Sequence, residues 1–98
     1  MVKHIVFFKI SDNVEDKQKA IDFVIETLYH LKDKIEQIKH YELGRNFSDR
    51  ATAYDIALVS HFDSKDDLNK YRNHPLHIQA VEKIKPYISS TAVVDYEI

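Results

Sequence analysis

Histidine is the side chain whose number and spacing in this sequence most directly suggest chemistry. The chain has six histidines among 98 residues, and one of them, His77, follows Tyr71 by six positions. A neutral imidazole takes up and returns a proton near neutral pH, and a hydrogen-bonded tyrosine polarises a carbonyl. His77 as a base, with Tyr71 orienting it or the substrate, is therefore coherent machinery for enolisation or ring closure.

The segment that carries these two residues has a second interpretation. Pro75 follows His74 and interrupts the helix that would be needed to carry Tyr71 and His77 together. Tyr71, His74 and His77 could instead form a hydrogen-bonded corner that holds the Pro75 turn. The spacing alone leaves both the catalytic pair and the structural corner open.

His4 is the third candidate, because it stands among apolar residues. Val2, Val6 and Phe8 share its side of a predicted strand. A buried histidine normally finds a backbone or side-chain partner. His4 is therefore either a satisfied core histidine or a polar group inside a ligand cavity.

The spacing of the histidines does not predict a metal centre. His74 and His77 could present two imidazoles on one face, but two ligands do not make a site, and no cysteine or acidic partner stands at a standard spacing. We therefore expect neither a metal nor a cofactor. Three histidines are expected to be solvated or to lie at the rim of a dimer: His30, His40 and His61.

The hydrophobic pattern predicts four strands that would position these residues. They are rich in β-branched and aromatic residues and span 2–10, 40–46, 53–62 and 91–98. Both sides of the first and third strands are apolar at the centre. Gly44 in the second strand indicates a bulge or a close backbone approach.

Helices are predicted between these strands. A capping pattern at Asp12 precedes an amphipathic stripe that runs to about residue 36. The same pattern at Ser64 starts a short helix through Tyr71. A further helical segment starts at Pro75 and ends at Pro86.

The resulting β-α-β-β-α-β order predicts a single α+β domain over residues 1–98 with a ferredoxin-like fold. Its four strands would form an antiparallel sheet with the helices on one face. The other face would expose more apolar surface than monomers usually do, so we expect a homodimer with two sheets packed face to face. A sheet curled over its own second face is the alternative.

Composition excludes several function classes. Lys and Arg number 14 against 16 Asp and Glu, so no basic excess favours binding to nucleic acid. The longest apolar run, residues 5–8, is too short for a membrane span or a signal peptide. With no cysteine and no targeting segment, a cytoplasmic location is expected.

Several segments taken together resemble the stress-responsive dimeric A/B barrel family, called Dabb. The resemblance covers essentially the whole chain, and its most specific part is Tyr-x-x-His-Pro-x-His with the opening histidine. The segments are Lys3-His4-Ile5-Val6, Tyr41-Glu42-Leu43-Gly44-Arg45-Asn46, Phe62-Asp63-Ser64, Tyr71-Arg72-Asn73-His74-Pro75-Leu76-His77 and Val94-Asp95-Tyr96.

This resemblance implies a ferredoxin-like subunit that pairs with a second copy into a closed barrel. One plant branch of the family contains polyketide cyclases, which close a ring by intramolecular aldol condensation. By motif position, His77, Tyr71 and His4 match the pocket residues of those cyclases. At the position of a further cyclase histidine this chain has Ile56, so the cyclase activity is not carried over.

Three functions are consistent with these observations. The preferred one is a pocket for a small, partly apolar organic molecule, with His77, Tyr71 and His4 as candidate catalytic residues. The first alternative is a non-catalytic dimeric stress or interaction module. The second is a haem-binding or cofactor-free monooxygenase-like barrel, by analogy of fold. Three further residues are expected to line the pocket: His74, Phe8 and Asp55.

Overall fold

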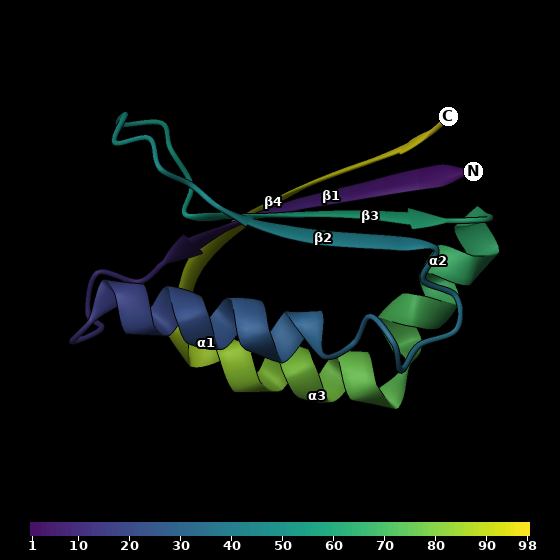
Figure 1. The fold of residues 1–98 in the computed structure, drawn as a ribbon, viewed down its shortest axis with the longest axis horizontal. Coiled ribbons are helices and arrows are strands. Elements are labelled where there is room, and N and C mark those ends of the chain that lie inside the picture. The colour runs from purple at the N-terminus through teal and green to yellow at the C-terminus, as the bar shows by residue number, and fades with distance from the viewer.

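A computed structural model describes all 98 residues, Met1–Ile98. Its elements in chain order are β1 (Val2–Ile10), α1 (Lys17–Tyr29), β2 (His40–Arg45), β3 (Ile56–Phe62), α2 (Lys65–Asn73), α3 (Pro75–Ile84), a 3-10 turn (Lys85–Tyr87) and β4 (Ile88–Glu97). The four strands form one antiparallel sheet in the order β2-β3-β1-β4 (Figure 1). The predicted ferredoxin-like fold is confirmed.

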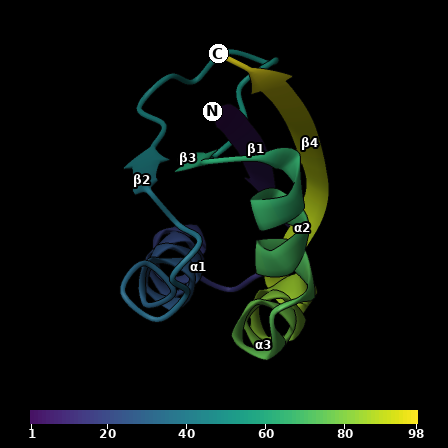
Figure 2. The ribbon, with the colours of Figure 1, turned by 90° about the vertical axis from the view of Figure 1, so that its right-hand side faces the viewer.

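The helices all lie on one face of this sheet. Figure 2 shows α1 and α3 side by side below the strands, with α2 descending from the sheet to α3. We call the covered side of the sheet the helix-facing side and the opposite side the outer side. The two-layer arrangement leaves the outer side without a helix over it, although the loop before β3 reaches one end of it, where Tyr54 lies beside Phe7.

The core lies between the sheet and the three helices. Alternate residues of β1, beginning with Val2, are buried, and so are alternate residues of β3, beginning with Ile56. Their apolar members pack with buried residues of all three helices into a single cluster of 18 buried residues, in which Val24 and Phe62 have no exposed surface. Burial with period two in strands and with helical spacing in α1 is what the apolar pattern predicts.

The first helix is shorter than predicted. It begins at Lys17, capped by the Asp16 side chain, which accepts a hydrogen bond from Lys19 N at 3.1 Å. The prediction that Asp12 caps it was wrong, and so was the end near residue 36, because α1 ends at Tyr29. Leu31 and Ile35 are still buried, but they reach the core from turns. The apolar spacing that predicted this helix therefore continues beyond the end of α1.

Other boundaries agree better. Ser64 caps α2 by accepting from Asp67 N at 3.1 Å, and Pro75 opens α3, both as predicted. The third strand begins at Ile56, later than predicted, and the fourth at Ile88, earlier than predicted. The pairing of β2 with β3 runs through Gly44 without a shift, and no atom lies within 4 Å of a Cβ added there. The expected bulge or close approach at Gly44 was wrong.

The outer side carries apolar side chains that contact water. Phe7 is 42% exposed, Val94 58% and Tyr96 42%. Ile5 pairs with Val59 on one side and with Val94 on the other, which makes an apolar row across three strands. The predicted apolar surface on the uncovered face is therefore present.

Candidate functional site

A row of polar side chains crosses the helix-facing side of the sheet. Tyr41 of β2 pairs with Ser60 of β3, Ser60 with His4 of β1, and His4 with Asp95 of β4. Residues paired across antiparallel strands point to the same side of a sheet. The pairing of the strands therefore aligns one polar side chain from each of the four strands, in a row across a mostly apolar surface.

His4 lies at the centre of this row and is buried. Its Nδ1 forms a hydrogen bond with Asp95 Oδ1, and the second Asp95 oxygen accepts from Arg72 Nη2 at 2.5 Å. The Ser60 hydroxyl donates to the His4 carbonyl oxygen at 3.2 Å. Because a carboxylate accepts, Nδ1 of His4 is the donor and Nε2 is left facing other partners. The histidine thus has the partner that a buried imidazole needs.

Tyr71 comes onto this row from α2. Its hydroxyl lies 2.9 Å from the hydroxyl of Tyr41, and both side chains are buried. Burial raises the pKa of Tyr71 to about 12 and raises the pKa of Tyr41 further. Both phenols are therefore protonated at neutral pH, so Tyr71 is suited to donate a hydrogen bond and not to act as a base.

His77 follows Tyr71 across the helix break. Its Nδ1 lies 3.0 Å from the carbonyl oxygen of Arg72, which only accepts, so Nδ1 carries the proton and Nε2 the lone pair. Burial lowers the pKa of His77, and the nearby His4, Arg72 and His74 charges lower it further, against the opposing effect of the Arg72 carbonyl. The imidazole is neutral at neutral pH, with Nε2 available as a base.

The break at Pro75 is what brings Tyr71 and His77 together. His74 ends α2 and caps α3, accepting a hydrogen bond from Leu76 N at 3.1 Å through its Nδ1. The chain turns there, and the rings of Tyr71 and His77 lie with their centroids 4.4 Å apart. His74 therefore forms the structural corner, while Tyr71 and His77 form a pair beside it.

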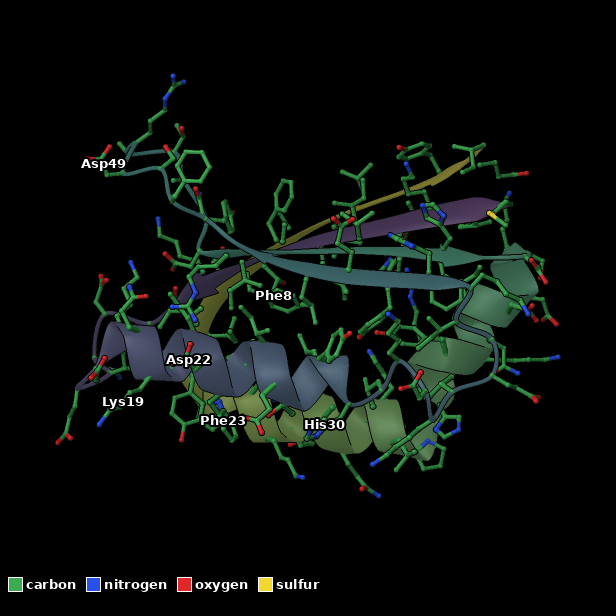
Figure 3. The ribbon with its side chains drawn as sticks, viewed as in Figure 1. Phe8, Lys19, Asp22, Phe23, His30 and Asp49 are labelled. Atoms are coloured by element: carbon green, nitrogen blue, oxygen red, sulfur yellow. The ribbon has the colours of Figure 1, made fainter.

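This pair opens onto a cavity between the sheet and the helices. The cavity has a volume of about 460 Å³. Its walls are mostly apolar, and the three candidate catalytic residues all line it. The lining residues are His4, Val6, Phe8, Leu28, Leu58, Tyr71, Arg72, His77, Val81, Ile84, Thr91 and Val93. Figure 3 shows the Phe8 side chain directed from the sheet toward the helices.

Two of the residues expected in the pocket lie elsewhere. His74 is occupied as the cap of α3 and does not line the cavity. Asp55 accepts from Ile10 N at 2.7 Å and pairs with Lys17 Nζ at 3.0 Å, and so joins the end of β1 to the start of α1. Its carboxylate is used in that junction because β1 pairs with β3 only as far as Phe8, which leaves the Ile10 N–H without a partner from β3.

Three residues of the site were not among the candidates that the sequence analysis named. Tyr41, Arg72 and Asp95 complete the hydrogen bonds of Tyr71 and His4. Asp95 has a signal in the sequence, since it is an acidic residue on the His4-facing side of the last strand once the two strands are paired. The position of Asp95 opposite His4 becomes visible only when the register between β1 and β4 is known.

The remaining histidines lie outside the cavity. His40 and His61 pair across β2 and β3 on the outer side, with ring centroids 4.8 Å apart. Burial lowers the pKa of His61, and the nearby His40 and Lys3 charges lower it further, against an opposing effect of Glu42. No group of three or more His, Cys, Asp or Glu side chains lies close enough together to hold a metal ion.

Comparison with known proteins places this geometry in a family. The stress responsive A/B barrel domain model, Dabb, matches residues 2–98. An uncharacterized protein of Streptomyces coelicolor is 33% identical over 97 residues, covering 99% of each chain. The chain also matches 46% of the length of the Arabidopsis thaliana stress-response A/B barrel protein DABB1, at 29% identity.

Solved structures show the same fold. A dimeric ferredoxin-like protein of unknown function from Bacteroides fragilis has 38% identity and a TM-score of 0.88, over 99% of this chain and 95% of that one. The hydroxynitrile lyase of Passiflora edulis has 26% identity and a TM-score of 0.84, over 99% of this chain and 92% of that one. The Bacteroides fragilis protein and a ferredoxin-like protein from Thermobifida fusca are both dimeric.

None of the helices is both long and apolar enough to cross a membrane. The family match, the fold and the relatives agree over nearly the full length of the sequence. The chain belongs to the stress responsive A/B barrel, or Dabb, domain family.

Proposed function

We propose that this protein binds a small, partly apolar carbonyl compound in the cavity beside β1, and that His77 and Tyr71 act on it as base and acid. The observation that carries this proposal is the meeting of the two side chains, 4.4 Å apart between ring centroids, at a cavity with apolar walls. Apolar pockets with a few convergent polar groups are the usual form of small-molecule sites.

The chemistry follows from the protonation states of the pair. His77 Nε2 takes a proton from the carbon next to the carbonyl, and the electron pair of that C–H bond moves to the carbonyl oxygen as the enolate forms. The Tyr71 hydroxyl donates a hydrogen bond to that oxygen, and the protonated imidazole later returns its proton to carbon or to a leaving group. The apolar walls strengthen these interactions by limiting water around the developing charge.

His4 has a supporting place in this proposal. Asp95 holds Nδ1 of His4, and so sets the ring's orientation at the floor of the cavity. Arg72 pairs with the same carboxylate through Nη2, so the two charges largely offset each other. The site therefore suits a neutral ligand. The hydroxynitrile lyase among the solved relatives supports a small-molecule site on this fold.

The proposal includes a homodimer that covers the outer side of the sheet. Apolar side chains exposed on that side, Phe7 and Val94 among them, would pack against a second copy. The cavity lies on the other side of the sheet, so each protomer would hold its own ligand.

Proton exchange tests the function directly. Acetophenone in D₂O, followed by ¹H NMR, reports removal of its methyl protons. The wild-type protein should accelerate their exchange over buffer, and His77→Gln should abolish the acceleration. His30→Gln, an exposed histidine outside this cavity, is the matched control.

The outcome separates the alternatives. Exchange at the buffer rate together with saturable shifts of cavity resonances would leave a binding module and reject the acid–base role. No saturable shift with acetophenone or cyclohexanone would reject the carbonyl ligand itself and favour the non-catalytic module.

A further inference from the structure

Tyr41 is a buried polar residue that the proposed function does not use. It comes from β2, is 2% exposed and does not line the cavity. Its hydroxyl has one partner, the Tyr71 hydroxyl at 2.9 Å. A buried hydroxyl group with one partner raises the question of which oxygen donates in that bond.

Burial decides the direction. If Tyr71 donated to Tyr41, the Tyr41 proton would have no acceptor, because no second polar atom lies in reach. An unsatisfied buried donor is costly. If Tyr41 donates, its proton is satisfied, and the Tyr71 proton is free to reach the cavity that Tyr71 lines. The second arrangement satisfies both hydroxyls once a ligand or water occupies the cavity.

We infer that Tyr41 is a positioning and specificity-determining residue: it donates to the Tyr71 oxygen, and this orients the Tyr71 hydroxyl proton toward the cavity. A site that presents a proton in this way favours ligands with an acceptor, such as a carbonyl oxygen, over ligands of the same shape that have no acceptor. The choice of ligand class rests on the proposed function, whereas the direction of the Tyr41–Tyr71 bond does not.

Fluorine NMR tests whether the Tyr41 hydroxyl acts on Tyr71. Incorporation of 3-fluorotyrosine labels all six tyrosines, and single Tyr→Phe variants assign their signals. A hydrogen bond donated to Tyr71 stabilises its phenolate, so Tyr41→Phe should raise the pKa of Tyr71. A Tyr71 phenolate accepts from Tyr41 whichever way the neutral bond points, so this rise establishes the contact, and the direction of the neutral bond is decided by the ¹³Cζ measurement below. An unchanged or lowered pKa of Tyr71 overturns the inference.

Tyr54→Phe is the matched control for this titration. Its hydroxyl also has a single hydroxyl partner, Ser90 at 3.3 Å, but outside the cavity. The Tyr71 titration should not move in Tyr54→Phe. Far-ultraviolet circular dichroism checks that both variants are folded.

A second measurement compares how fast the two tyrosine hydroxyl protons exchange with solvent, and it needs only the variants that assign the signals. In equal parts of H₂O and D₂O, a slowly exchanging tyrosine hydroxyl splits its ¹³Cζ signal in two. Tyr41, with its proton held in a buried bond, should show two signals, and Tyr71 one averaged signal. Two signals for Tyr71 and one for Tyr41 would reverse the assignment, even if Tyr41→Phe does not fold.

Ligand selectivity completes the test. We expect the wild-type protein to prefer acetophenone over α-methylstyrene, which has a CH₂ group in place of the carbonyl oxygen, and Tyr41→Phe to reduce this ratio of Kd values about fivefold, the worth of one neutral hydrogen bond. If neither compound binds but the Tyr71 pKa rises as expected, the proposed ligand class fails and the role of Tyr41 stands. If the ketone binds and its preference is unchanged in Tyr41→Phe, the specificity role is overturned.

Discussion

The two sides of the sheet are built from the same strands and differ in almost every physical respect. The helix-facing side carries a buried polar row, from Tyr41 through His4 to Asp95, and a cavity. The outer side has the exposed apolar residues Phe7 and Val94 and no helix over it, and the loop before β3 reaches it only at one end, beside Phe7. Figure 3 shows side chains rising from both sides, with the helices below only one.

The difference assigns the proposed binding site and the proposed dimer interface to strand residues of opposite parity. Even-numbered residues of β1 face the helices, and odd-numbered residues face outward. Because successive side chains of a strand point to opposite sides, two neighbouring residues serve unrelated purposes. A mutation on one side should therefore leave the other side's property intact.

Substitution of the neighbouring residues Phe7 and Phe8 by alanine tests this separation, and Phe8→Ala has the largest expected effect on the free energy of unfolding. Phe8→Ala removes a side chain that is 7% exposed in the core and should lower the free energy of unfolding by about 3–5 kcal/mol. Phe7→Ala should lower it by about 1 kcal/mol in the monomer. Urea denaturation at low protein concentration measures both. Equal losses would contradict the assignment of the two sides.

Val94→Asp should act on assembly alone. A carboxylate placed in the apolar row with Ile5 and Val59 would be buried without a partner in the dimer. The cost of about 3 kcal/mol corresponds to a dimer Kd roughly 100-fold higher. Sedimentation velocity measures it, with Asn69→Asp on the exposed side of α2 as the control. A dimer that persists unchanged would show that this face is not the interface.

The smallest effect expected is on the pH dependence of stability. The pKa values of His77 and His61 are both lowered by burial in the fold, so the unfolded chain binds more protons as the pH falls through 6.5. Stability should therefore be constant at higher pH and decline below about pH 7. His77→Gln should reduce this decline at every protein concentration.

His61→Gln should change the pH dependence of stability in a different way from His77→Gln. His61 lies on the outer side, where a second copy would add burial, so its contribution should grow with protein concentration. Urea denaturation at two concentrations and several pH values separates the two histidines. A concentration dependence for His77 as well would mean that the cavity and the interface are coupled.

Local sequence signals predicted most of the fold. The alternation in β1, the cap at Ser64 and the start of α3 at Pro75 are set by neighbouring residues, and the structure agrees with each. The same local reasoning extended α1 too far. Leu31 and Ile35 keep helical spacing but reach the core from turns, because burial requires only that a side chain point inward.

The candidate site was less accessible to this reasoning. Tyr71 and His77 were recognised by type, but their meeting depends on the direction of the chain after His74, which only the packing of α2 and α3 decides. Asp55 shows the reverse case. Its side chain was expected in the pocket, and a backbone N–H of β1 holds it elsewhere.

The sequence by itself therefore determined the order of the elements, the parity of the strands and the residue types available for chemistry, since these depend on spacings of a few residues. Tertiary structure decided which of those residues meet. His4 and Asp95 are 91 positions apart, and Tyr41 and Tyr71 are 30 apart. Their contacts follow from strand register and helix packing, which are set by the burial of the whole core and not by any local pattern.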